Sequence, residues 1–210
     1  VDNTHSESIV RTVVALAPPP PVLRGTGCTT AAEAMPGWGR PSVPCHAAFR
    51  NIRAGMGGIP IVYQFLLDRP GDARTVVLGF CESHWGEAGK RPVVIRVEGA
   101  PERRLDPLAE WGQHKPGGVL FKANDVDKDG RIDVRVLPAE GAPDRNPILN
   151  VIWVYPADQA LDLAEVVAGR ADAKALIVAD VGGPGDGPIL DPGKMDFTGG
   201  CPTYHIDLAP

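Results

Sequence analysis

Short apolar runs rich in Val and Ile recur along this chain, and their spacing most constrains its fold. Each run is bounded by Gly, Pro or Asp, which favour turns, and from residue 59 onward the runs follow one another at short intervals. This pattern is typical of short strands in a two-sheet sandwich or jelly roll. The predicted strands cover residues 8–17, 59–67, 75–83, 92–99, 118–123, 131–137, 148–155 and 173–183.

One segment has a helical period instead. In "DQALDLAEVVAG", residues 158–169, apolar side chains fall at Leu161, Ala164 and Val167, and Gly169 ends the pattern. We therefore expect one short helix in a chain that is otherwise built of strands.

Turn-forming residues support an all-β domain. The chain has 25 Gly and 22 Pro among 210 residues, scattered rather than clustered, which favours many short strands over a helical bundle. Residues 24–47 are punctuated by Gly, Pro and Cys and are predicted to form a long loop stapled by disulfides. We expect an N-terminal strand and polyproline arm over 1–23 and a single β-sandwich over 24–210.

Charge and hydropathy narrow the classes of partner and location. The net charge is −5 and no basic patch stands out, which argues against a nucleic-acid partner. No apolar run reaches about 18 residues, so no transmembrane segment is expected. The chain begins at Val1 rather than Met, which suggests either that an export leader has been removed or that the sequence was cut from a longer one. The sequence therefore predicts an extracellular or cell-surface protein.

Four cysteines agree with that location. Cys28, Cys45, Cys81 and Cys201 form an even set without a C-x-x-C pair, whereas a zinc site needs tighter spacing. Two disulfides in an oxidising compartment are the favoured interpretation, and four buried free thiols are the alternative. Of the three possible connectivities, we predict Cys28–Cys45 with Cys81–Cys201.

The stretch "NDVDKDGRIDV", residues 124–134, resembles a calcium-binding loop. Its spacing would supply oxygens in the order of an EF-type loop, with Gly130 at the sharp turn. Position twelve is Val136 instead of Glu, and a strand follows instead of a helix. The alternative is a hairpin turn, because Asp-Gly favours positive φ. The candidate ligands of a structural calcium ion are Asp125, Asp127, Asp129, Arg131 through its carbonyl, and Asp133.

Signatures of enzymes are scarce. The chain has no G-x-S-x-G elbow, H-E-x-x-H pair or Walker loop. In "CESHWGE", residues 81–87, a strand would place Glu82 and His84 on one face as a conceivable acid–base pair, with Glu87 nearby. Packing and turn hydrogen bonds are the favoured roles for these residues. We therefore expect a protein without catalytic activity, and the weaker alternative is a glycan-active enzyme that uses Glu82, Glu87 or the Asp cluster.

Three tryptophans are candidates for binding carbohydrate. Trp38, Trp85 and Trp111 lie in predicted loops beside Gly, where an aromatic ring can serve as a platform for a sugar. Each of them could equally cover the open end of a sandwich. Trp153 instead lies within the strand 148–155, between apolar neighbours, so part of that strand is expected to face either outward or toward a second layer.

Two longer stretches carry a resemblance to a known family. "YQFLLDRPGDARTVVLGFCESHWGEAGKRPVVIRVEGA" is similar to the centre of malectin-like domains, and "DGRIDVRVLPAEGAPDRNPILNVIWV" resembles their closing pair of strands. The resemblance covers residues 60–155, about half the chain. It implies a galactose-binding-like β-sandwich outside the cytoplasm, non-catalytic and often carbohydrate-binding.

The order of segments departs from that family. "VADVGGPGDGPILDPGKMDFTGG", residues 178–200, is similar to the segment that opens a malectin-like domain, yet it lies near the C-terminus. The domain is then either circularly permuted, or this segment completes the sheet of another subunit, since an unfilled sheet edge readily pairs with a donated strand.

The N-terminal arm suggests self-assembly. The apolar strand at 8–17 would aggregate in water unless paired, and Pro18–Pro21 form a stiff spacer that prevents a tight hairpin. We therefore predict a non-catalytic structural subunit that forms a homopolymer or fibre with copies of itself by exchange of terminal strands. The alternative is a carbohydrate-binding module with glycans as partners. The predicted assembly residues are Ile9, Val10, Val13, Val14 and Leu16.

Overall fold

A computed structural model describes the backbone of residues 25–28, 30–183 and 203–206 and the side chains of 30–183. The predicted strand at 8–17, its assembly residues and most of the segment 178–200 lie outside these ranges. Within the described part of the chain, none of the helices is long and apolar enough to cross a membrane.

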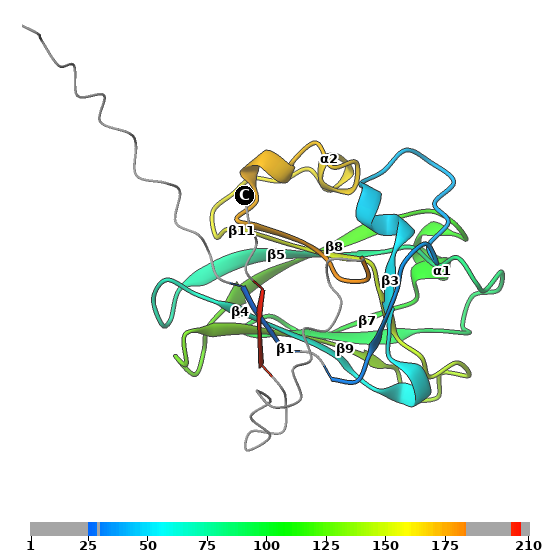
Figure 1. Ribbon diagram of the computed structural model, residues 1–210, viewed down its shortest axis with the longest axis horizontal. Coiled ribbons are helices and arrows are strands. Elements are labelled where there is room, and N and C mark those ends of the chain that lie inside the picture. The colour runs from blue at the N-terminus through cyan, green and yellow to red at the C-terminus, as the bar shows by residue number, and fades with distance from the viewer. Residues whose placement is uncertain (1–24, 29, 184–202, 207–210) are drawn as a thin grey trace, which may run out of the picture.

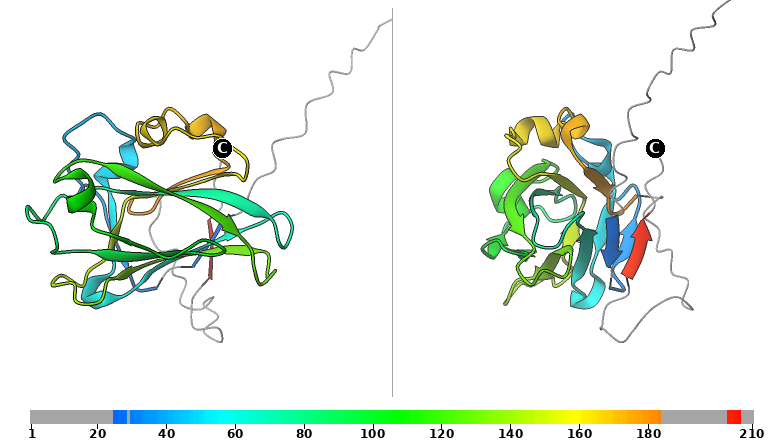
Figure 2. Two further views of the ribbon diagram at one scale, coloured as in Figure 1. Left: turned by 180° about the vertical axis from the view of Figure 1, so that it is seen from behind. Right: turned by 90° about the vertical axis from the view of Figure 1, so that its left-hand side faces the viewer.

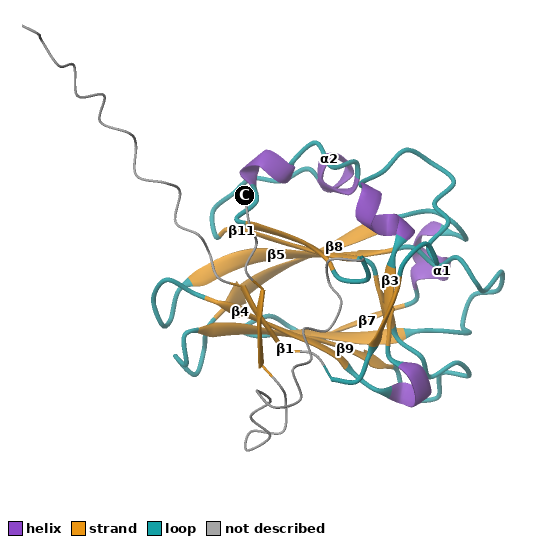
Figure 3. Cartoon of the chain, in the orientation of Figure 1, coloured by secondary structure: helices purple, strands orange, loops and turns teal. Residues whose placement is uncertain are grey.

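Two four-stranded antiparallel sheets face each other and form the body of the molecule (Figures 1 and 3). The first sheet has the order β12-β11-β5-β8, and the second has the order β4-β9-β6-β7. The strands of the first sheet are β12 (Ile177–Asp180), β11 (Val151–Pro156), β5 (Ala73–Phe80) and β8 (Gly117–Asn124). Those of the second sheet are β4 (Ile61–Leu66), β9 (Arg131–Pro138), β6 (Val93–Val97) and β7 (Arg103–Leu105).

Smaller elements close one end and one edge of this sandwich. A three-stranded sheet has the order β10-β3-β2, and a separate pair joins β1 to β13 (Figure 2). These strands are β10 (Ile148–Leu149), β3 (Ile52–Ala54), β2 (Glu33–Met35), β1 (Gly25–Cys28) and β13 (Thr203–Ile206). The helical turns are α1 (Pro107–Trp111), α2 (Leu163–Val167), η1 (Ala47–Arg50), η2 (Met56–Gly58) and η3 (Asp172–Lys174).

The main core lies between the two large sheets, and a second core lies on the outer face of one of them. In β11, Ile152 and Val154 belong to the main core, whereas Trp153 and Tyr155 belong to a second cluster with Phe49. Residues of η1 and α2 cover that cluster. A strand that is buried on both faces is apolar at every position, which explains the continuous apolar run at 151–155. Of the two alternatives for the strand of Trp153, an outward face or a second layer, the structure contains the second layer.

The all-β sandwich class is confirmed, but several boundaries differ from the sequence prediction. Strand β5 ends at Phe80, so residues 81–83 form a loop rather than a strand end. The α-helix expected over 158–169 is only α2, because its N-cap is Asp162, whose side chain accepts from the Ala164 N–H. The elements β2, β3, β7 and α1 were not predicted. Each has five residues or fewer and therefore shows no clear period.

The described part of the segment 178–200 pairs within its own chain. Its first residues belong to β12, which is antiparallel to β11 with Val178 opposite Trp153. These residues therefore complete the molecule's own sheet and not that of another subunit. The remainder of the segment lies outside the described residues.

The thiols of Cys45 and Cys81 are free in this structure. The side chains of Cys28 and Cys201 lie outside the described residues, so the pairs Cys28–Cys45 and Cys81–Cys201 stay predictions from the sequence. Cys81 is fully buried behind the end of β5, among the apolar side chains of the second core.

Candidate functional site

A pocket of about 460 Å³ opens at the end of the sandwich where β5 stops and the three-stranded sheet begins. Its floor is apolar and comes from Ile52 and Ala54 of β3 and Ile148 of β10. Its rim comes from four segments, which follow β2, β3, β5 and β9 in the sequence. The remaining lining residues are Met35, Trp38, Met56, His84, Trp85, Lys90, Arg91, Pro143, Asp144 and Asn146.

Trp38 is held out at the rim by a tight turn between two glycines. Gly37 has φ 75°, and a Cβ on Gly39 would lie 2.0 Å from the Phe49 carbonyl oxygen. Only glycine fits so close to another backbone. The Gly39 N–H donates to the Arg50 carbonyl over 3.0 Å, which fastens the turn to η1. As a result the Trp38 side chain remains 44% exposed although the turn beneath it is fixed.

Trp85 is clamped at both its backbone and its ring. Its N–H donates to Glu82 Oε1 over 3.1 Å, and its indole Nε1–H donates to Asp144 Oδ2 over 2.7 Å. Arg91 joins the two acceptors, because it donates to Glu82 Oε2 over 2.9 Å and to Asp144 Oδ2 over 2.6 Å. These hydrogen bonds form a closed circuit through four residues. The indole therefore has a fixed orientation at the pocket before any ligand arrives.

The charges in this circuit are almost entirely removed from water. Glu82, Arg91 and Asp144 have side chains that are 2%, 9% and 9% exposed. Burial raises the pKa of Asp144, but hydrogen bonds from Trp85, Asn146 and Arg91, together with the Arg91 charge, outweigh burial and hold that pKa below its usual value. Asp144 is therefore an anion at neutral pH, with Oδ2 already accepting from two side chains.

The groups that face the pocket are mainly aromatic rings and hydrogen-bond donors. The rings of Trp38 and His84 lie 5.9 Å apart and those of His84 and Trp85 lie 4.8 Å apart, so three rings follow one another along the rim. Lys90 contributes an ammonium group, which also contacts Glu87 over 3.2 Å. Asn146 contributes an amide whose oxygen accepts from the Gly57 N–H.

Two of the three predicted sugar-binding tryptophans thus meet at one pocket, and the third does not. Trp111 lies at the end of α1, packs against the main core and covers Gly117.

The structure also shows the hydrogen bonds of Glu82 and His84, the conceivable acid–base pair. Glu82 is buried in an ion pair with Arg91 and its Oε1 accepts from the His84 N–H over 2.8 Å. Turn hydrogen bonding, the favoured prediction for Glu82, is what the structure contains.

At the opposite end of β5, the acidic loop between β8 and β9 folds around one carboxylate. The Asp125 side chain accepts from the backbone N–H groups of Gly71, Asp129 and Gly130, over 2.8, 3.1 and 2.9 Å. Burial raises the pKa of Asp125, but these backbone hydrogen bonds outweigh it and lower the pKa. The turn has positive φ at Lys128 and Gly130 rather than at Asp129.

The hairpin alternative for this loop is wrong. β8 pairs with β5, whereas β9 pairs with β4 and β6, so residues 125–130 cross from one large sheet to the other. A crossing loop has no partner strand to fix its turn, and the Asp125 carboxylate performs that role.

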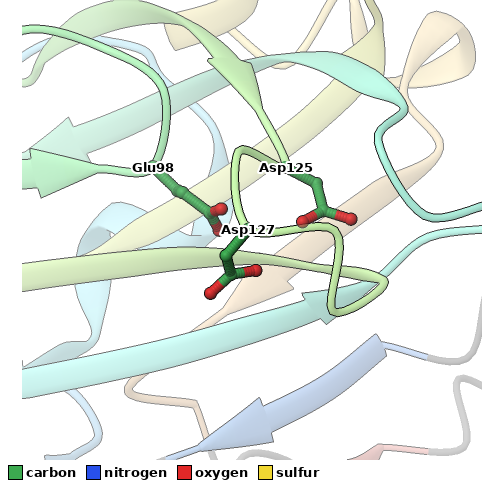
Figure 4. Close-up of side chains that lie close together, drawn as sticks. All are labelled: Glu98, Asp125 and Asp127. Carbon is green, nitrogen blue, oxygen red and sulfur yellow. The ribbon is translucent and has the colours of Figure 1, made fainter.

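The loop also forms a cluster that could hold a metal ion, but with a different set of ligands from the predicted one. Oxygens of Glu98, Asp125 and Asp127 lie within 4.8 Å of one another (Figure 4). Asp129, Arg131 and Asp133 do not belong to that group: Asp129 Oδ1 accepts from the Arg131 N–H, while Asp133 contacts Gln64 and Arg135.

Glu98 was missed because it lies far from the loop in the sequence. It follows β6, and its two carboxylate oxygens accept from the N–H groups of Val126 over 2.7 Å and Asp133 over 3.3 Å. The only sequence signal would have been an acidic residue directly after a strand that neighbours β9.

Comparison with known proteins gives a fold but no relative by sequence. No protein-family model matches the chain, and no curated protein does either. The structure is similar to the ANXUR2 extracellular domain from Arabidopsis thaliana, with a TM-score of 0.47 and 14% identity over 64% of this chain. It is also similar to a chain in the complex of the plant peptide RALF23 with FER and LLG2, with a TM-score of 0.51 and 14% identity over 61% of this chain.

In both cases the match covers 40% of the length of the plant chain. At these identities the likeness concerns the fold alone. The matched receptor ectodomains contain malectin-like domains, which confirms the fold that the resemblance implied. The chain is therefore a β-sandwich with the malectin-like fold.

Proposed function

We propose that this chain is a non-catalytic carbohydrate-binding module whose ligand occupies the pocket of Trp38 and Trp85. One observation carries the proposal: two tryptophans that belong to different loops meet at the rim of a single apolar-floored pocket. Aromatic rings of this kind pack against the C–H faces of a sugar, while polar groups at the rim meet its hydroxyl groups.

The state of the pocket before binding also favours a ligand. Trp85 is oriented by the circuit through Glu82, Arg91 and Asp144, and Trp38 stands on the turn tied to η1. A site whose rings are already in place loses less conformational entropy when the ligand arrives. Lys90 and Asn146 then provide hydrogen-bond donors to sugar oxygens at the edge of the rings.

The carboxylates of the pocket support binding rather than catalysis. Hydrolysis of a glycosidic bond generally needs two carboxyl groups that flank the bond, one as acid and one as base or nucleophile. Asp144 is the only carboxylate among the lining residues, and its Oδ2 accepts from Trp85 and twice from Arg91. Glu82, behind it, is ion-paired with Arg91.

We also propose an extracellular or cell-surface location, in keeping with the malectin-like fold. Self-assembly by strand exchange has no support among the described residues, because the strand at 8–17 lies outside them and β12 pairs with β11 of the same chain. Polymerisation with copies of itself stays a prediction from the sequence, and glycans are the partner proposed here.

A calcium ion at Glu98, Asp125 and Asp127 is proposed as a second, structural feature. Hard carboxylate oxygens suit calcium, and the loop joins the two large sheets, so an ion there would stabilise the crossing without taking part in ligand binding. Thermal melting with excess calcium against chelator tests this proposal.

The test of the main proposal is binding of the purified chain to an array of immobilised glycans, followed by calorimetry on any glycan that binds. Replacing Trp38 by Ala is expected to weaken binding roughly fivefold, since one aromatic stacking partner contributes about 1 kcal/mol. Val43→Ala is the matched control, because Val43 is also exposed, at 46%, but does not line the pocket. Binding of no glycan, or equal loss in both variants, would contradict the proposal.

A further inference from the structure

Two chain segments that supply the pocket run side by side, and each contains a cysteine. The Arg40 N–H donates to Ser83 Oγ over 2.9 Å, which ties the loop before Cys45 to the residues after Cys81. On the other side, the Asn150 side chain accepts from the Cys81 N–H over 2.7 Å and donates to the Phe49 carbonyl over 3.2 Å. Residues on both sides of Cys45 are therefore fastened to the immediate surroundings of Cys81.

The two thiols also share one apolar environment. Cys81 is fully buried in the second core with Phe49 and Trp153, and Cys45 packs against the same cluster while partly buried. In Figures 1 and 2, η1, which follows Cys45 and His46, lies over the sheet that contains β5. Burial, with smaller contributions from the charges of Cys45 and Glu82, raises the pKa of Cys81 to about 11.

We propose that Cys45 and Cys81 form a disulfide in an oxidising compartment, which would tie the loop of Trp38 to the loop of Trp85. The free thiols in this structure are then the reduced form of the pair. This connectivity differs from the one the sequence suggested. It does not depend on the ligand of the pocket, so it stands or falls separately from the proposed function.

The position of Cys28 favours this connectivity over Cys28–Cys45. Cys28 ends β1, where its backbone pairs with Thr203 of β13. β1 belongs to a two-stranded pair that is separate from the sheet of β5. The segment of Cys45 is fastened to the surroundings of Cys81 by the Arg40–Ser83 hydrogen bond and by the two hydrogen bonds of the Asn150 side chain.

The chemistry is thiol–disulfide exchange with a small disulfide such as oxidised glutathione. One cysteine thiolate attacks a glutathione sulfur and releases a glutathione thiolate, and the second cysteine then attacks the mixed disulfide and releases another. Two cysteines are oxidised, one glutathione disulfide is reduced, and the two thiol protons pass to the released thiolates. A buried thiol of raised pKa reacts slowly, so the bond is expected to form during folding rather than afterwards.

The experiment is refolding of the full reduced chain in a glutathione redox buffer, alkylation of remaining thiols, and mass spectrometry without reduction. Cleavage by trypsin and by a protease that cuts after Glu places each cysteine on its own peptide, because Glu33 lies between Cys28 and Cys45. The expected result is residues 34–50 joined to residues 75–82. Cys45 joined to Cys28 or Cys201, or alkylated Cys45 and Cys81, would overturn the proposal.

Paired variants give a second measurement. In the variant C28S/C201S, which retains the proposed bond, reduction is expected to lower the melting temperature by about 10 °C, the shift for a closed loop of this length. In C45S/C81S, which lacks it, reduction should leave the melting temperature free of that shift. A reduction-sensitive melting temperature only in the second variant would contradict the proposed connectivity.

Discussion

The two ends of strand β5 carry the two candidate sites, and they are built in opposite ways. Strand β5 has eight residues, so its ends lie roughly 25 Å apart. At the Ala73 end, the Asp125 carboxylate accepts from three backbone N–H groups, two from its own loop and one from Gly71 of the loop before β5. At the Phe80 end, the rim of the pocket comes from four segments, with Arg91 between two carboxylates. The comparison separates a carboxylate held by backbone donors from carboxylates held by one buried side-chain cation.

This difference predicts where the molecule is vulnerable. A carboxylate that is bound by backbone groups keeps its partners as long as the turn is intact. A carboxylate that depends on one buried cation loses its compensation when that single side chain is removed. The pocket end is therefore expected to be more sensitive to substitution than the loop end, and the following predictions test that expectation from the largest effect to the smallest.

Replacing Arg91 by Met should have the largest effect. It leaves Glu82 and Asp144 buried without a counter-ion, and breaking a buried pair in this way costs about 3–5 kcal/mol of the free energy of unfolding. Urea denaturation at pH 7 measures this loss in the free energy of unfolding. Arg96→Met is the matched control, because the ion pair of Arg96 with Glu102 is more than half exposed and exposed pairs contribute about 1 kcal/mol or less. Equal losses in the two variants would contradict the account of the pocket.

Calcium should stabilise the loop end. An ion that binds only the folded state at one hundred times its dissociation constant adds about 2.7 kcal/mol, so the melting temperature should rise with calcium and fall with chelator. Asp127→Asn should abolish the response without disturbing the turn, since the Asp125 carboxylate retains its three backbone donors. An unchanged melting temperature in the native chain would remove calcium from the account.

Removal of two buried hydroxyl groups near the second core should change the free energy of unfolding in opposite directions. Tyr155 Oη has no hydrogen-bond partner among the described residues, and burial, with the Asp172 charge, raises its pKa to about 12. Tyr155→Phe should therefore leave the free energy of unfolding unchanged or raise it by up to about 1 kcal/mol. Thr75 Oγ1 contacts Ala157 and Lys122 over 2.9 and 2.7 Å, so Thr75→Val should lower it by about 1–3 kcal/mol. A larger loss in Tyr155→Phe would contradict this.

The smallest effects should appear in the pH dependence of stability below neutral pH. The folded pKa of Asp144 is lowered, so its contribution is present above the unfolded pKa and is lost as pH falls through the folded value. The folded pKa of Asp129 is raised by burial and by the Asp127 charge, so its contribution is present below the unfolded pKa and is lost as pH rises through the folded value.

Urea unfolding between pH 2.5 and 7 should therefore give a flatter rise of stability with pH for Asp144→Asn than for the native chain. Asp129→Asn should give a steeper rise, because a contribution of opposite sign has been removed. Changes of the same sign in both variants would show that the two ends do not differ in the way described.

Much of the fold could be predicted from the sequence because its signals are local. The strands around Val76, Ile95 and Ile132 have apolar runs closed by turn residues, and the apolar neighbours of Trp153 left either an outward face or a second layer as the alternatives. The elements β2 and β3 could not be predicted. Each has three residues, and only their pairing with one another and with β10 makes them strands.

The residues of the candidate sites also divide into those with a local sequence signal and those brought together only by the fold. Asp125 and Asp127 were predicted because their spacing is local, whereas Glu98 joins them only through the arrangement of β6 and β9. Trp38 and Trp85 were each suspected as exposed rings in loops, but their meeting at one pocket depends on contacts between segments that are distant in the sequence. Trp111 had the same local signal and packs on the core instead.

The central claim is that a carbohydrate occupies the pocket of Trp38 and Trp85, and the indole N–H signals of the four tryptophans test it most directly. A nitrogen–proton correlation spectrum, assigned by single Trp→Phe variants, would be recorded during titration with a glycan that binds on the array. The account predicts that the signals of Trp38 and Trp85 shift together while those of Trp111 and Trp153, which lie in the cores, stay in place. A glycan that shifts Trp111 or Trp153 and leaves Trp38 and Trp85 unchanged would contradict it.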